Sequence, residues 1–255
     1  SARANALPES TISPGPAADP TRFTDGAEAG GPNTGYFGGG GGTPSPKSTM
    51  DKTSFASDTT AVVPGAALSV ARRYAAATGN STHGYFGGGD DVISTMDKVT
   101  YASDTTAAVP GAALSVARYH LTATGNSTAG YFGGGFDYTI PGSFSTMDKT
   151  TYASDTTAAV PGAALSAARY GAGATGNSTH GYFGGGSPGP KSTMDKVTYA
   201  SDTTAAVPGA ALSAARYLSA ATGNSTAGYF GGGGGGAIST MDKVTYASDT
   251  TAAVP

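Results

Sequence analysis

Short segments in which apolar and polar residues alternate, separated by turn residues, recur along the chain. In residues 145–152, Met147 and Thr151 fall on one face of an extended chain and Asp148 and Tyr152 on the other, so that one face can be buried. No segment keeps its apolar residues at the 3.6-residue spacing of an amphipathic helix. The pattern therefore predicts β-strands joined by turns.

Four strands are predicted in each unit of the pattern. In the unit that begins at Arg118 they cover residues 119–124, 130–134, 145–152 and 157–160. Gly125-Asn126 supplies a turn that accepts positive φ, and Pro161-Gly162 ends the last strand. Residues 136–144 form an insert between the second and third strands. Four short strands with their connections have the size of a propeller blade.

The unit is repeated almost identically along the chain. The tyrosine of its Gly-Tyr-Phe motif occurs at Tyr36, Tyr85, Tyr131, Tyr182 and Tyr229, in steps of 46 to 51 residues. Pro-Gly pairs divide the chain into five units between Pro14 and Pro255. We therefore predict an all-β, five-bladed β-propeller over residues 22–255, with strands near the two termini adjacent and residues 1–21 as an arm or extra strand. A β-solenoid or fibre is the alternative, although its coils are usually much shorter.

The repeat resembles the kelch repeat. Gly133-Gly134 follows the aromatic pair Tyr131-Phe132, Tyr152 comes later, and Arg169 precedes the next unit; the pattern recurs throughout residues 22–255. The resemblance implies four-stranded, kelch-like propeller blades. The late Trp of kelch repeats is replaced by small residues, which implies thinner packing between blades. The residue sequences of the motifs are also similar to those of Gly-Tyr-Phe-Gly-Gly-Gly repeat proteins of marine cyanobacteria and their phages.

Composition excludes several classes of partner. The 41 Gly and 15 Pro approach the low-complexity range, so order has to come from the repeat. The 14 basic residues are spread over the units and the net charge is −3, which leaves no basic stripe for nucleic acid. Cys is absent. Because no apolar run is long enough to span a bilayer or to form a signal-peptide core, we expect no membrane insertion.

No constellation of catalytic residues is visible in the sequence. The spacing Gly231-x-Gly233-x-x-Gly236 matches a dinucleotide pattern, but no βαβ unit surrounds it. The three histidines lack metal-ligand spacing, and His83 and His180 alternate with Ala at the equivalent positions of other units. We predict no catalytic residue, cofactor or metal, and hence no enzyme; a propeller-type enzyme is an alternative. The sequence Asn-Ser-Thr, at Asn80, Asn126, Asn177 and Asn224, is formally an acceptor for N-glycosylation. The Gly-Asn pair that contains each of these asparagines is also typical of hairpin turns.

The inserts between the second and third strands vary while their flanks stay nearly identical. They cover residues 41–47, 90–93, 136–144, 187–191 and 234–238. Variable loops on a rigid scaffold commonly carry recognition, so we expect them on one face, as binding loops. The predicted contact residues are Phe136, Asp137, Tyr138, Ile140, Asp90 and Asp91. Asp90-Asp91 could also contribute to a Ca²⁺ site, but a solvated loop is the simpler interpretation.

The function that these features favour is a noncatalytic structural or recognition module of an extracellular assembly or virion appendage. Its partners would be a surface glycan or a protein and other structural subunits of the assembly. A purely architectural unit of a larger array or fibre is the alternative.

One arginine precedes the first strand of each unit. These are Arg22, Arg72, Arg118, Arg169 and Arg216. They are predicted to form a ring near the channel mouth on the insert side. Five guanidinium groups in a ring need counter-charges, and Ser-Thr-Met-Asp supplies one Asp per unit: Asp51, Asp97, Asp148, Asp195 and Asp242. We predict one-to-one bidentate ion pairs. A basic ring that captures an anion is the alternative.

Overall fold

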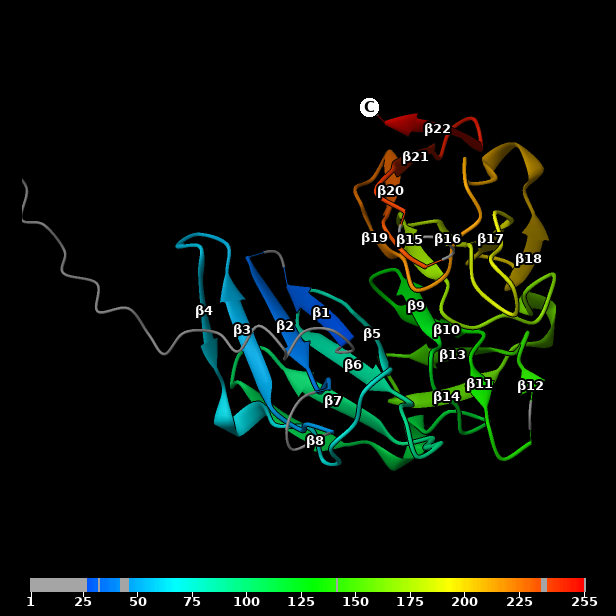
Figure 1. The fold of residues 1–255 in the computed structure, drawn as a ribbon. Helices are drawn as coiled ribbons and strands as arrows, with labels where there is room; N and C mark the ends of the chain where they lie inside the picture. Colours follow the sequence, from blue (N-terminus) through cyan, green and yellow to red (C-terminus); the bar gives the residue numbers. More distant parts are fainter. Residues whose placement is uncertain (1–26, 32, 42–45, 141, 235–237, 255) are drawn as a thin grey trace, which may run out of the picture.

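The structure is a computed structural model that describes residues 27–31, 33–41, 46–140, 142–234 and 238–254. These residues form five four-stranded antiparallel sheets arranged as a β-propeller (Figure 1). The predicted fold class and the number of blades are therefore confirmed. The predicted arm at residues 1–21 and Arg22 lie outside the described residues.

Each blade pairs its strands in the order of the sequence. The first blade holds β1 (Ala27–Gly31), β2 (Thr34–Gly38), β3 (Met50–Ser54) and β4 (Thr59–Val62). The second holds β5 (Ala76–Gly79), β6 (His83–Gly87), β7 (Met96–Thr100) and β8 (Thr105–Ala108). The third holds β9 (Thr122–Gly125), β10 (Ala129–Gly133), β13 (Met147–Thr151) and β14 (Thr156–Ala159). The fourth holds β15 (Gly173–Gly176), β16 (His180–Gly184), β17 (Met194–Thr198) and β18 (Thr203–Ala206). The fifth holds β19 (Ala220–Gly223), β20 (Ala227–Gly231), β21 (Met241–Thr245) and β22 (Thr250–Val254).

Two local features add to the predicted strands. The third insert carries a small hairpin of β11 (Phe136–Asp137) and β12 (Gly142–Ser143). Each Pro-Gly-Ala forms a 3-10 turn in the linker to the next blade: η1 (Pro64–Ala66), η2 (Pro110–Ala112), η3 (Pro161–Ala163) and η4 (Pro208–Ala210). Proline suits the first position of such a turn because its φ is already fixed near the helical value.

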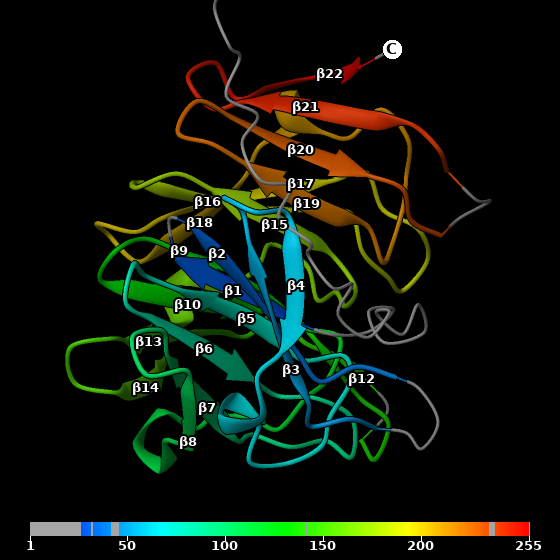
Figure 2. The same ribbon diagram turned by 90° about the vertical axis from the view of Figure 1, so that its left-hand side faces the viewer.

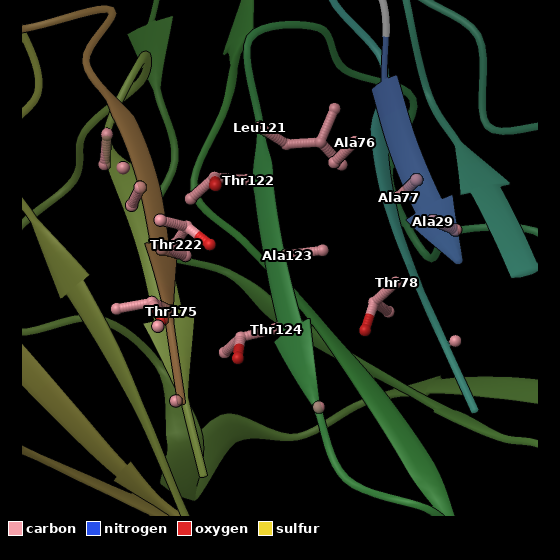
Figure 3. A pocket seen from close by; sticks show the side chains of 18 of the residues that line it. Ala29, Ala76, Ala77, Thr78, Leu121, Thr122, Ala123, Thr124, Thr175 and Thr222 are labelled. Carbon is pink, nitrogen blue, oxygen red and sulfur yellow. The ribbon is translucent and has the colours of Figure 1, made fainter. Parts of the chain in front are cut away.

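The first strand of each blade faces a central channel. Residues of β1, β5, β9, β15 and β19 line a shared cavity of about 560 Å³ (Figure 3). Its wall consists mainly of Ala, Thr and Gly, with Thr78, Thr124 and Thr175 at the same level of successive blades. Small side chains let the inner strands approach the common axis.

The predicted contact between the first and last blades is not found. β1 lies beside β5, β5 beside β9, β9 beside β15 and β15 beside β19, but no extended contact joins the last blade to the first among the described residues. Figure 1 shows sheet β1–β4 at the left and sheet β19–β22 at the upper right; Figure 2 turns β4 toward the viewer. The number of repeats determines the number of blades. Whether the ring of blades closes depends on the angle between neighbouring blades, which cannot be predicted from the repeated sequence.

Neighbouring blades are joined by hydrophobic clusters that reuse the same repeat positions. Between the second and third blades, Tyr85 and Met96 pack with Phe132 and Tyr152 of the next sheet and with Leu114 of the linker. Three further clusters have the same construction. This confirms the expectation that the linker leucines and the Tyr-Phe pairs join the blades. The leucines are Leu68, Leu114, Leu165 and Leu212.

A polar contact, here called the clasp, borders each cluster. Tyr85 stacks on Tyr152 of the next blade with ring centroids 4.8 Å apart, and its hydroxyl donates to Asp155. The Lys98 ammonium forms an ion pair with the same carboxylate at 2.8 Å. The other clasps are Tyr36–Lys52–Asp104, Tyr131–Lys149–Asp202 and Tyr182–Lys196–Asp249. Each clasp therefore ties one blade to the next through a charge that the next blade supplies.

The clasps shift the pKa values of their members. Burial and the hydrogen bond to Asp155 raise the pKa of Tyr85 above its usual value. Burial would also raise the pKa of Asp155, but the bonds from Lys98 and Tyr85 hold it below its usual value. The other three clasps show the same directions for Tyr and Asp.

These shifts predict a window of pH in which the protein is most stable. Because the Asp pKa values are lowered on folding, that stabilisation is present above the unfolded pKa of about 4 and is lost as the pH falls below it. Because the Tyr pKa values are raised, their contribution is present below about pH 10 and is lost at higher pH. Melting temperatures measured across pH should fall at both ends. In an Asp155→Asn variant the acid loss should be smaller; an equal loss would contradict this account.

The Gly-Gly pairs that follow the second strands allow the backbone to contact the linker between two blades. Gly134 has a φ of +68°, and a Cβ there would overlap the carbonyl oxygen of Arg169. The next residue, Gly135, donates its backbone N–H to that same carbonyl at 2.9 Å. Only glycine combines the left-handed conformation with this close approach of two backbones. The glycines thus place the linker and its arginine.

Candidate functional site

The inserts and the linkers between blades meet on one side of the propeller. Asp90 accepts from the backbone N–H of Arg73 at 2.8 Å, Phe136 pairs with Tyr119, Ser187 with Tyr170, and Gly234 with Tyr217. Every one of these contacts joins an insert to the segment that enters an inner strand. The described parts of the inserts are therefore gathered on the linker side; residues 42–45, 141 and 235–237 lie outside the described residues.

The predicted arginine–aspartate pairs are present in four blades. Arg118–Asp148 and Arg169–Asp195 have N–O distances of 2.9 Å, Arg216–Asp242 has 2.8 Å, and Arg72 pairs with Asp97 in the same way. All eight side chains are almost wholly buried. The expected bidentate geometry is wrong: each arginine contacts only Oδ2, and the Oδ1 atoms have no hydrogen-bond partner among the described residues.

Each arginine also donates hydrogen bonds to backbone carbonyls. Arg169 donates from Nη1 to the carbonyls of Gly185 and Thr193, both at 3.1 Å, and so ties the two ends of the fourth insert to the linker. Burial lowers the pKa of Arg118, and the Asp148 carboxylate offsets part of that shift. Because these guanidinium groups are buried and paired, they are poorly placed to capture an anion from solution. They are structural parts of the insert side.

A hydrogen-bonded rim runs across four linkers at the channel mouth. It consists of Tyr74, His120, Gly171 and Leu218, all with φ between +53° and +61°. The N–H of His120 donates to the carbonyl of Tyr74 at 3.0 Å, Gly171 to His120 at 2.8 Å, and Leu218 to Gly171 at 2.6 Å. Bulky residues in the left-handed region cost about 1–2 kcal/mol each. The scaffold imposes this conformation and presents a different side chain from each blade.

Six aromatic rings form a continuous cluster at this rim. Tyr74 and His120 lie 3.9 Å apart between ring centroids, and Tyr119 lies 5.7 Å from Phe136 and 5.9 Å from Tyr138. Tyr170 completes the cluster, 5.1 Å from Phe136 and 6.0 Å from His120. The rings come from three linkers and one insert. Beside them a pocket of about 350 Å³ opens between the rim residues.

The predicted contact residues of the third insert divide into two groups. Phe136 belongs to the aromatic cluster, and Tyr138 and Ile140 are 53% and 62% exposed at its edge. Asp137 is instead buried and accepts hydrogen bonds from the N–H and hydroxyl of Thr139, at 2.7 and 2.6 Å. Its carboxylate caps the hairpin turn, so that the hairpin presents apolar and aromatic side chains.

The second insert is fixed by an ion pair. Asp90 binds the Arg73 guanidinium at 2.9 Å, and this guanidinium lies over the Tyr74 ring, 5.0 Å from its centroid. Asp91 is exposed, with a φ of +61°. The described residues contain no group of three or more His, Asp or Glu side chains that could hold a metal ion. Asp90 therefore orders the rim, and any contact role of Asp90 and Asp91 stays a prediction.

Four residues of the aromatic cluster, Tyr74, Tyr119, His120 and Tyr170, are not among the contact residues predicted from the sequence. A signal for them is present in the sequence, because the three residues that directly follow the arginine differ from unit to unit. They are Arg73-Tyr74-Ala75, Tyr119-His120-Leu121, Tyr170-Gly171-Ala172 and Tyr217-Leu218-Ser219. This is a second variable segment per repeat, and the structure places it against the inserts. Both kinds of variation between blades thus lie at one mouth of the channel.

His120 should remain neutral at pH 7. Burial, followed by the charge of Arg73, lowers its pKa to about 4, with Asp90 opposing. Because the folded pKa is below the unfolded value of about 6.5, the stability that this group confers is present above pH 6.5 and is lost as the pH falls toward 4. NMR titration should show the His120 ring titrating well below the more exposed His83. A midpoint at or above 6.5 would contradict the buried geometry.

Comparison with protein-family models and with curated proteins found no match. Among the described residues, no helix is long and apolar enough to cross a membrane.

Proposed function

We propose that this protein is a noncatalytic recognition module that binds a surface glycan at the aromatic mouth of the propeller. The observation that carries the proposal is the gathering of both variable segments, with six aromatic rings, on one side of an otherwise repetitive scaffold. Aromatic rings offer flat apolar faces with polar edges, which suit the C–H faces and hydroxyl groups of a sugar ring.

The scaffold supports this role by its rigidity. The buried arginine pairs and the rim hydrogen bonds fix the linkers from which the rings project. Preformed sites lose less conformational entropy on binding than mobile ones. We also propose that the blades are kelch-like, because of the arrangement of Gly133-Gly134, Tyr152 and Arg169. The module would belong to an extracellular or virion appendage, beside other structural subunits. A purely architectural role is the second candidate, favoured by the exposed blade faces described below.

Shortening the third insert should abolish glycan binding. Replacing residues 136–143 by a three-residue link, which with Phe144 gives the four-residue length of the second insert, removes Phe136 and Tyr138. Tyr138→Ala alone should weaken binding about tenfold or more. Glycan arrays followed by titration calorimetry would measure this, with circular dichroism as a check on folding. Val62→Ala, an exposed change on the outer strand β4, is the matched control. Binding that survives the deletion, or a protein ligand with no glycan signal, would contradict the proposal.

A further inference from the structure

Among the described residues, the outward faces of the first and last blades are unpaired, and each presents one half of the interface that joins neighbouring blades. On the last blade, Met241 is 43% exposed, whereas Met50, Met96, Met147 and Met194 at the same repeat position are at most 1% exposed. In every internal interface this methionine packs beneath the aromatic residues of the following blade. The last blade therefore presents a formed docking face.

The polar half of the clasp is also unmatched on the last blade. Tyr229 and Lys243 occupy the positions of Tyr182 and Lys196, which bind Asp249. Neither Tyr229 nor Lys243 has a side-chain hydrogen bond, ion pair or ring contact among the described residues. To complete a clasp, this face needs a carboxylate and an aromatic ring in the positions that the next blade supplies in the internal clasps.

The first blade offers those two groups. Phe55 stands where Tyr101, Tyr152, Tyr199 and Tyr246 stand in the other blades, and it is 53% exposed while the tyrosines at the three later positions are buried. Asp58 stands at the position of Asp104, has the same left-handed conformation (φ 50° and 52°), and is exposed. It has no ion pair among the described residues. The two faces are complementary in the repeat positions of their rings and in charge.

We propose that a second copy of this chain docks its first blade against the last blade of the first copy. Asp58 of one copy then receives the Tyr229 hydroxyl and the Lys243 ammonium of the other, and Phe55 stacks on Tyr229. A second copy supplies these groups in the register of the internal interfaces and leaves all four of them unchanged. The two faces of a single chain, by contrast, make no extended contact with each other among the described residues.

This interface is heterologous, because two different faces meet. Each copy keeps one free face after docking, so association continues beyond the dimer or ends in a closed ring. The contact should be weaker than the internal ones, because it joins separate molecules, whereas each internal interface joins two blades that the chain already holds close together. We therefore expect reversible association that depends on concentration.

Charge reversal tests the docking directly. Asp58→Lys places two cations at the contact, and Lys243→Asp places two carboxylates there; each variant alone should associate about tenfold or more weakly than the unaltered chain. Mixing the two variants restores opposite charges at both kinds of contact and should restore association. Sedimentation velocity over a range of concentrations measures this, with Asp91→Lys on the second insert as the control. Association that is insensitive to either reversal, or a chain that stays monomeric at all concentrations, would overturn the proposal.

Cross-linking distinguishes a second copy from closure of one ring. Because the chain has no Cys, a short thiol-specific linker can react only at introduced sites. A mixture of Phe55→Cys and Tyr229→Cys chains should give a covalent heterodimer. A chain that carries both changes should give covalent oligomers. A cross-link confined to single chains would show that the faces close on each other and would overturn the proposal.

Discussion

Replacing Asp148 by Asn is expected to lower the free energy of unfolding by about 3–5 kcal/mol, because it leaves a buried arginine without its counter-charge. Arg118 and Asp148 are both fully buried, with an N–O distance of 2.9 Å. The carboxylate also accepts the backbone N–H of Ser115 at 3.2 Å and so fastens the linker to β13. The amide of Asn keeps the shape and removes the charge.

Urea denaturation followed by circular dichroism would measure this loss. Asp91→Asn, at an exposed position, is the matched control and should change stability by less than about 0.5 kcal/mol. A double variant in which Arg118→Met accompanies Asp148→Leu should recover much of the loss, because apolar residues can replace a buried ion pair. Unchanged stability of Asp148→Asn together with tighter binding of phosphate or sulfate would show that the arginines form an anion site.

The repeat made most of the fold predictable. Alternation in segments such as 145–152 indicated the strands, and the recurrence of one Arg and one Asp per unit indicated the buried pairs, because unpaired charges are rarely tolerated inside a protein. The third strand was expected at residues 145–152 and found at Met147–Thr151. The first strand was expected from Tyr119 and begins at Thr122, since residues 119–121 turn along the rim.

The candidate site was less predictable, because it depends on contacts between segments distant in sequence. Exposed aromatics in the third insert were visible in the sequence, but their association with Tyr119 and Tyr170 requires the path of the linkers. The left-handed conformation of Tyr74, His120 and Leu218 has no sequence signature, since glycine occurs only at position 171 of the four. The linkers before these residues are nearly identical in sequence, and the same conformation follows each of them whatever the side chain at this position.

Closure of the propeller could not be predicted for a related reason. Each internal interface repeats the same contacts, so a small rotation per blade is multiplied four times around the axis. The sequence pattern and the spacing of the repeats give the number of blades, but they do not give the angle between neighbouring blades. The exposure of Met241 was therefore not predictable from residue type, because the methionine at the same repeat position of the fourth blade, Met194, is buried.

Phe183→Ala should lower the free energy of unfolding by about 3–5 kcal/mol, because it removes a fully buried aromatic ring from between two blades. The ring packs with Met147 and Leu165 in the cluster that joins the third and fourth blades, and it is wholly inaccessible to solvent. The neighbouring strands are held by their own ladders and cannot collapse into the space, so a cavity remains.

The exposed face supplies matched controls within the same molecule. Phe55→Ala makes the same chemical change at a residue that is 53% exposed, and Met241→Ala can be compared with Met194→Ala at the buried position of the same repeat. In dilute protein, where copies are separated, we expect Phe55→Ala and Met241→Ala to cost less than about 1 kcal/mol, and Met194→Ala about 2–5 kcal/mol. Equal losses at Met194 and Met241 would mean that the last blade is already covered within a single chain.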